Sequence, residues 1–336
     1  MLKKYSTPLF IVLLLFFFLM DLSFGTIRIP FGKVLEILSG SDEVKNTWTY
    51  IVLNYRLPKA IAAVLTGMAL SVSGLMMQTL FRNPMAEAYV LGISSGASLA
   101  IAISILGGAM LPSVVLEYTT SSYGLVVVSI IGSLLLLLLV LAVSNKVKNS
   151  MTILIVGLMF GSFANAIVSI LSYLSNAEQL KRYSLWMLGS LGNLSWEMLT
   201  VYSVAVVVGL FSCLFLFRTL DAFLLGDTYA SSLGINVKKS RNYIVLVTSL
   251  LAGASTAFVG PIAFIGLAIP HIARLLLQTS RHRELFIASV FLGGIVLLIC
   301  DILSQLKGEA FLLPINALTA LFGAPIVIYL LLRKRV

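Results

Sequence analysis

The side chains able to perform catalysis or to hold a metal are few and far apart in this sequence. The two cysteines, Cys213 and Cys300, lie inside apolar runs, and neither His271 nor His282 is spaced with them as metal ligands are. A catalytic triad would need a base with oriented partners, and neither histidine has them nearby in the sequence. We therefore expect no metal site, no cofactor and no disulfide. Both thiols are expected to be buried, and both histidines to have structural roles.

A phosphate-binding loop is also missing. The stretch from Gly25 to Gly32-Lys33 resembles one superficially, but its glycines are too far apart and Val34 stands where a serine or threonine is required. The sequence contains no His-Glu-x-x-His and no Cys-x-x-Cys motif. These absences predict that the chain is not an enzyme and does not itself hydrolyse ATP.

The acidic residues bear on a different source of energy, an ion gradient. A carrier driven by ions needs ionisable residues in the middle of its spans. Asp301 is the one clear candidate inside an apolar run, and Asp21 lies at the end of another. An aspartate near a helix end is more often a hydrogen-bonded anchor than a proton carrier. A gradient-driven secondary carrier stays open as the alternative function.

Neutral polar side chains are more frequent within the apolar runs. Ser162, Asn165 and Ser169 are separated by three and four residues, so they share one face of a helix. Such residues suit a translocation pathway that a separate motor opens and closes. Hydrogen bonds between helices would explain them equally well.

The chain that must position these residues is strongly apolar. Of its 336 residues, 59% are hydrophobic and 11% are charged, whereas soluble domains have about 45–50% and about 25%. Such a chain needs membrane lipid as part of its solvent. The net charge of +10 does not indicate a nucleic-acid partner, because the basic residues stand at the ends of apolar runs and form no continuous stripe.

Apolar runs bounded by charged or turn-forming residues define the spans. They lie near 8–24, 57–80, 88–108, 123–143, 151–174, 197–217, 243–259, 262–278, 285–305 and 312–332. The sequence therefore predicts an all-α membrane protein with about ten transmembrane helices, in a single domain over 1–336. One division leaves an alternative open, because Gly260-Pro261 could instead kink one long helix between 243 and 278.

The basic and aromatic residues predict an orientation. With both termini in the cytoplasm, most of the 23 lysines and arginines fall on the cytoplasmic side, as the positive-inside rule requires. Those that fall outside are Arg28, Lys33, Lys45, Arg56, Lys59, Lys181, Arg182 and Lys307. Trp48, Trp186 and Trp196 fall at outer boundaries, where amphipathic rings settle among lipid headgroups.

The longest segment on the predicted cytoplasmic side covers 218–242. Between Asp221 and Gly234 its apolar residues have helical spacing, and Gly226 and Gly234 divide it into two short helices at the membrane surface. Composition alone leaves two interpretations open. The segment is either a plain amphipathic linker or a docking site for a soluble partner that supplies energy.

Ordered sequence blocks along nearly the whole chain resemble the FecCD family, the permease subunits of ABC importers for iron–siderophore complexes, haem and cobalamin. In the first half the blocks are Arg56-Leu57-Pro58-Lys59, Gly67 to Gly74, Gln78, Arg82 to Ala86 and Leu91 to Ala97. In the second half they are Leu225-Gly226-Asp227, Ala230, Leu233-Gly234, Gly260-Pro261-Ile262, Phe264 to Leu267, Pro270-His271, Arg274, Asp301, Leu313-Pro314-Ile315 and Gly323-Ala324-Pro325.

The resemblance implies an assembly. It implies a homodimer with the pathway along its axis, two copies of an ATP-binding ATPase subunit beneath it, and an extracytoplasmic substrate-binding protein above it. The short helices of the 218–242 segment would be coupling helices that sit in a cleft of the ATPase. The residues implied for this contact are Asp221, Leu225, Gly226, Asp227, Ala230, Leu233 and Gly234.

The resemblance also implies roles for the outer face and for the pathway. Arg56 and Lys59 match positions at which the family binds acidic residues of the binding protein, and Lys307 is added from the last outer loop. Lysine at 59, where arginine is common, keeps the charge but loses the bidentate fork. The fifth and tenth spans are implied to line the pathway, and the fifth carries the face formed by Ser162, Asn165 and Ser169.

We therefore expect an ATP-driven importer permease in the bacterial cytoplasmic (inner) membrane, multi-pass and with both termini in the cytoplasm. Its cargo would be an iron chelate such as a siderophore, haem or cobalamin, delivered by a binding protein. The sequence does not choose among these bulky cargoes. A bare metal ion fits less well, because the spans lack ligands for one.

Overall fold

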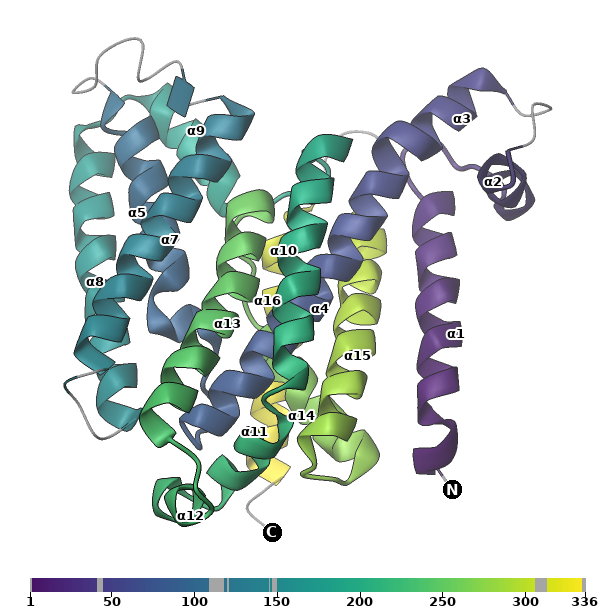
Figure 1. The fold of residues 1–336 in the computed structure, drawn as a ribbon. Helices are drawn as coiled ribbons and strands as arrows, with labels where there is room; N and C mark the ends of the chain where they lie inside the picture. Colours follow the sequence, from purple (N-terminus) through teal and green to yellow (C-terminus); the bar gives the residue numbers. More distant parts are fainter. Residues whose placement is uncertain are drawn as a thin grey trace.

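The computed structural model describes residues 2–40, 45–108, 118–119, 121–144, 146, 150–305 and 313–333, and every regular element in these ranges is helical. The chain forms a bundle of long helices with short helices at both ends (Figure 1). In chain order the elements are α1 (Leu2–Ser23), α2 (Phe31–Leu38), α3 (Asn46–Ile51), the π-helix η1 (Val52–Arg56), α4 (Leu57–Leu80), the 3-10 helix η2 (Ala88–Leu91), α5 (Ile93–Ile105), α7 (Ser122–Ser144), α8 (Ser150–Leu174), α9 (Ala177–Met187), α10 (Trp196–Leu214), α11 (Phe217–Leu224), α12 (Asp227–Ser232), α13 (Val237–Val259), α14 (Ile265–Leu277), α15 (His282–Ser304) and α16 (Ile315–Arg333).

The apolar helices match the predicted runs. Within the described ranges, 6 helices are long and apolar enough to cross a membrane: Asn46–Leu80, Ser122–Val143, Met151–Leu174, Trp196–Leu214, Val237–Val259 and His282–Ser304. The remaining runs are occupied by the shorter apolar helices Thr7–Ser23, Ile93–Ile105, Ile265–Leu277 and Ile315–Tyr329. The predicted class, an all-α membrane protein with about ten spans, is confirmed.

Helix α4 is the centre of the bundle, where it contacts α10, α13, α14 and α15. Small residues bring backbones together, because no hydrophobic force drives helices together in lipid. A Cβ atom on Gly67 would lie 2.1 Å from the carbonyl oxygen of Gly293 in α15, and one on Gly74 would lie 1.8 Å from that of Gly266 in α14. Helix α4 is therefore in direct backbone contact with both neighbours.

Helices α13 and α14 are separate. Helix α13 ends at Val259, and Gly260 follows with φ +86°. After a short extended stretch, α14 begins at Ile265 behind Phe264, whose φ is +70°. The alternative of one long kinked helix between 243 and 278 is therefore wrong.

The two ends of the bundle carry different elements. Both termini lie at the same end as α11 and α12, whereas α2, α3 and α9 lie at the opposite end (Figure 1). Trp48 in α3, Trp186 in α9 and Trp196 at the start of α10 all belong to that opposite end. The relative placement of termini, short helices and tryptophans is as predicted.

Candidate functional site

Two short helices project from the end of the bundle that carries the termini. Gly226 begins α12 with φ +110°, and Gly234 follows it with φ +81°. Both values lie in a region that only glycine enters without strain, which is why these glycines break the helices as predicted. Helix α11 begins earlier than expected, at Phe217.

The segment between the short helices and the next span is shorter than predicted. Helix α13 begins at Val237, because the side chain of Asn236 accepts a hydrogen bond from the backbone N–H of Lys239 and caps the helix. Lys238, Lys239 and Arg241 therefore lie in the first turns of a helix rather than in a loop.

Three large apolar side chains are exposed on and beside the two short helices. Leu225 is 65% exposed, Leu233 is 59% exposed and Tyr229 is 48% exposed, whereas Ala230 is fully buried. The predicted contact residues thus divide into an outward group and a group that packs on the bundle. Large apolar side chains that remain exposed together typically mark a binding surface. We call Leu225, Tyr229 and Leu233 the apolar ridge.

An ion pair attaches α12 to the bundle. The Asp227 carboxylate lies 3.2 Å from the Arg241 guanidinium of α13 and 3.9 Å from that of Arg82, which follows α4. The Arg241 side chain is only 5% exposed, and burial strengthens attraction between opposite charges. The pair therefore connects α12 to α13.

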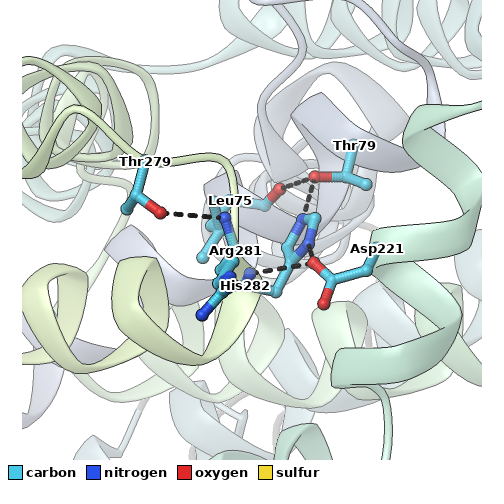
Figure 2. Close-up of polar contacts among 6 residues, drawn as sticks. All are labelled: Leu75, Thr79, Asp221, Thr279, Arg281 and His282. Atoms are coloured by element: carbon cyan, nitrogen blue, oxygen red, sulfur yellow. Dashed lines mark hydrogen bonds and ion pairs between the residues drawn. The ribbon is translucent and has the colours of Figure 1, made fainter.

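A hydrogen-bonded chain attaches α11 (Figure 2). Oδ1 of Asp221 accepts from the backbone N–H of His282 at 2.9 Å and lies 2.6 Å from its Nδ1. Nε2 of the same ring lies 2.7 Å from Oγ1 of Thr79 in α4, and that hydroxyl lies 3.0 Å from the carbonyl oxygen of Leu75. The ring is 1% exposed. His282 thus connects α11, α15 and α4, which agrees with its predicted structural role.

Helix α14 is held by polar groups around α4. Nε2 of Gln78 donates to the carbonyl oxygens of Gly266 and Leu267, each at 3.2 Å, and its Oε1 accepts from Arg274 at 2.6 Å. The interhelical interpretation of polar residues within spans therefore holds for Gln78. In the same region, Nε2 of His271 lies 3.0 Å from the carbonyl oxygen of Pro84.

Glu87 fastens the segment after α4 to the start of α14. Its carboxylate accepts hydrogen bonds from the backbone N–H groups of Phe264 and Gly266. Burial raises the pKa of Glu87 to about 7, although these two hydrogen bonds act in the opposite direction. Nothing in the sequence around Glu87 marks this role, because its partners follow in the chain only after many intervening helices.

The opposite end of the bundle contains a charged cavity of about 670 Å³. Lys59 and Asp301 line it, and their Nζ and Oδ1 atoms lie 2.9 Å apart. Asp301 is buried and paired, which is the anchoring role expected of an aspartate near a helix end. Gln305 also lines the cavity, and its amide donates to the Asp301 carboxylate at 3.1 Å.

Arg56 lies at the same cavity but points into the protein. It donates to the backbone oxygens of Leu22 at 2.8 Å, of Ser23 at 3.1 Å and of Ile27, and it is 8% exposed. These bonds hold the chain that leaves α1. Of the residues predicted to dock a partner, Lys59 is 19% exposed and Lys307 lies outside the described residues.

The predicted pathway residues lie on an open face of α8. Ser162, Asn165 and Ser169 are all exposed, and Oγ of Ser169 donates to the backbone oxygen of Asn165 at 3.0 Å. Only 28% of the apolar 18-residue window within Met151–Leu174 is buried in the subunit. This face has room for a second copy or for lipid.

The apolar spans define a multi-pass membrane protein. The chain belongs to the FecCD transport family, which its residues 13–333 match.

Curated relatives and solved structures agree. The hemin transport system permease protein HmuU of Yersinia pestis is 34% identical over 326 residues, covering 97% of this chain and 94% of the relative. The vitamin B12 import system permease protein BtuC of Klebsiella pneumoniae is 35% identical, covering 96% and 92%. A metal-chelate type ABC transporter solved in an inward-facing conformation has a TM-score of 0.85 at 25% identity, covering 98% of this chain and 99% of that one.

Proposed function

We propose that this chain is the permease subunit of an ATP-driven ABC importer that carries haem, cobalamin or a chelated metal into the bacterial cytoplasm. The relatives named for hemin and vitamin B12 transport match it over nearly their whole lengths. The observation that carries the proposal is the exposed apolar ridge. The short helices beside it, α11 and α12, are attached to α13, α15 and α4.

The ridge would sit in a cleft of a separate ATPase subunit, with two such subunits per dimer. Leu225 and Leu233 would make the apolar contact, while Gly226, Ala230 and Gly234 shape the helices and Asp221 and Asp227 tie them to the spans. ATP binding would then bias the permease between outward-open and inward-open arrangements without any reaction on this chain. In this arrangement α11, α12 and both termini would lie in the cytoplasm.

The pathway would lie between two copies of the chain. The exposed face of α8 with Ser162, Asn165 and Ser169 supports this arrangement, because these side chains are neutral and small and would not trap a bulky cargo. At the outer end, Lys59 and Lys307 would meet acidic residues of a binding protein. Arg56 would position the segment that forms the rim of the cavity.

Purification of the tagged chain from its native membrane tests the proposal. We expect an ABC-type ATPase to co-purify in equal copy number, and we expect Leu233→Glu to lose it. The matched control is Leu35→Glu in α2 at the opposite end, where Leu35 is 44% exposed, and this variant should retain the ATPase. A wild-type dimer that carries cargo on a proton gradient without any ATPase would establish the secondary-carrier alternative instead.

A further inference from the structure

The short helix α11 is attached to the two central spans by apolar packing and by one polar contact. It contains 8 residues, and helices this short are not stable alone. Its own Leu220, Ala222 and Phe223 are buried, and the rings of Phe217 and Phe286 pack with centroids 5.2 Å apart. The polar contact adds direction, because hydrogen bonds depend on geometry.

Asp221 caps the N-terminus of α15. His282 is the first residue of α15, so its backbone N–H has no partner within the helix. Oδ1 of Asp221 accepts that N–H and faces Nδ1 of the same residue. A negative charge is also favoured at a helix N-terminus. The Asp221 side chain is 47% exposed and that of His282 is 1% exposed, so removal of the carboxylate would take the acceptor from two donors at the edge of a buried site.

The ring of His282 also forms a hydrogen bond with α4, through Thr79. A carboxylate only accepts, so Nδ1 must carry a proton, and Nε2 is left to face Oγ1 of Thr79. In a neutral ring, the Thr79 hydroxyl donates to Nε2. In a charged ring, Nε2 donates to the hydroxyl, which then donates to the carbonyl oxygen of Leu75, 3.0 Å away. The connection therefore survives in either charge state of the ring.

Helices α15 and α4 remain joined along their whole length. At the end of the bundle that carries α11 and α12, His282 of α15 contacts Thr79 of α4. In the middle, a Cβ atom on Gly293 would lie 2.2 Å from the carbonyl oxygen of Gly67, so the backbones touch. At the far end, Asp301 of α15 pairs with Lys59 of α4 beside the charged cavity. The two helices are thus joined at both ends and in the middle.

We propose that Asp221, His282 and Thr79 are positioning residues that make α11, α15 and α4 move together. We call these three connected helices the lever. A displacement of α11 would then reach the cavity at Lys59 and Asp301. This inference rests on the proposed function, since it assigns a route for the ATPase-driven movement. It also distinguishes the two short helices, because α12 is attached through Asp227 to Arg241 of α13 and to Arg82 after α4.

The test is transport per ATP hydrolysed by the complete complex of permease, ATPase and binding protein in proteoliposomes. The probe is hemin, or cyanocobalamin if the wild type does not carry hemin. We expect Asp221→Ala to bind the ATPase and hydrolyse ATP as the wild type does, with a roughly tenfold lower ratio of cargo to ATP. Thr79→Val should act in the same direction, and the double variant should be no worse than Asp221→Ala.

Conservative variants provide the controls for folding. Asp221→Asn keeps an accepting oxygen and Thr79→Ser keeps the hydroxyl, so both should restore the ratio to within about twofold of the wild type. The matched control for the site is Arg283→Gln, which neutralises the exposed neighbour of His282 and should leave the ratio unchanged.

Two results would overturn the lever. One is a wild-type ratio in Asp221→Ala, and the other is loss of ATPase binding in Asp221→Ala, which would make Asp221 a contact residue. Failure of the proposed function has a different signature, because the wild-type chain itself would then bind no ATPase.

Discussion

Lys59 of α4 and Asp301 of α15 form an ion pair with 2.9 Å between Nζ and Oδ1, at the end of the bundle opposite to His282. The Asp301 side chain is 3% exposed and that of Lys59 is 19% exposed. The Asp301 carboxylate is thus buried against its partner, and removal of either residue leaves the other charge uncompensated. The pair therefore bears on the stability of the protein.

Replacement of one partner of this ion pair should destabilise the protein. Asp301→Asn leaves the Lys59 charge without its partner, so we expect a loss of about 2–4 kcal/mol, reduced somewhat because Lys59 is partly solvated. The double variant Asp301→Asn with Lys59→Gln should recover much of that loss. Thermal unfolding in detergent measures both. Equal thermal midpoints for Asp301→Asn and the wild type would show that the ion pair does not stabilise the fold.

Gly226→Ala should distort the junction between α11 and α12. An alanine at φ +110° is strained by about 1–2 kcal/mol, and its Cβ atom would lie 3.2 Å from the Arg82 guanidinium. We expect weaker binding of the ATPase in a pull-down, with the membrane bundle still folded. The matched control is Gly32→Ala in α2, where a Cβ atom meets nothing within 4 Å. Equal ATPase binding by the two variants would contradict this account of Gly226.

Much of the architecture could be predicted from the sequence, because its causes are local. Hydropathy located the apolar helices, and Gly226 and Gly234 marked the ends of the short helices since their φ values exclude other residues. The charges of Lys238 and Lys239 predict a loop, but α13 already begins at Val237, because Asn236 caps it.

The contacts between distant segments could not be predicted. Asp221 and His282 are separated by 61 positions, and only the folded bundle brings α11 beside the start of α15. Arg56 shows the same limit, because nothing in its sequence context distinguishes an arginine that faces a partner from one that binds the carbonyl groups of a neighbouring turn.

Glu87 predicts a dependence of stability on pH. Its pKa in the folded protein is about 7, above the ordinary value of 4.5, so the folded state binds the proton more tightly than the unfolded chain does. The stabilisation is therefore fully present below about pH 4.5 and is lost as the pH rises through about 7.

Glu87→Gln should remove this dependence, because the amide stays neutral at every pH. The thermal midpoint of the wild type should fall relative to that of the variant between about pH 5 and pH 8, by an amount that corresponds to roughly 1–3 kcal/mol. Parallel pH profiles of the two proteins would show that the Glu87 carboxyl has no raised pKa in the folded state.

The central claim is that ATP hydrolysed by a separate subunit drives import through this chain. The most direct measurement is uptake of hemin, cyanocobalamin and a ferric siderophore by proteoliposomes that contain the permease, its ATPase and its binding protein, with the membrane potential and the proton gradient collapsed. We predict uptake of one of these cargoes that requires ATP and persists without any gradient. Uptake that disappears with the gradient and is indifferent to ATP would contradict the claim.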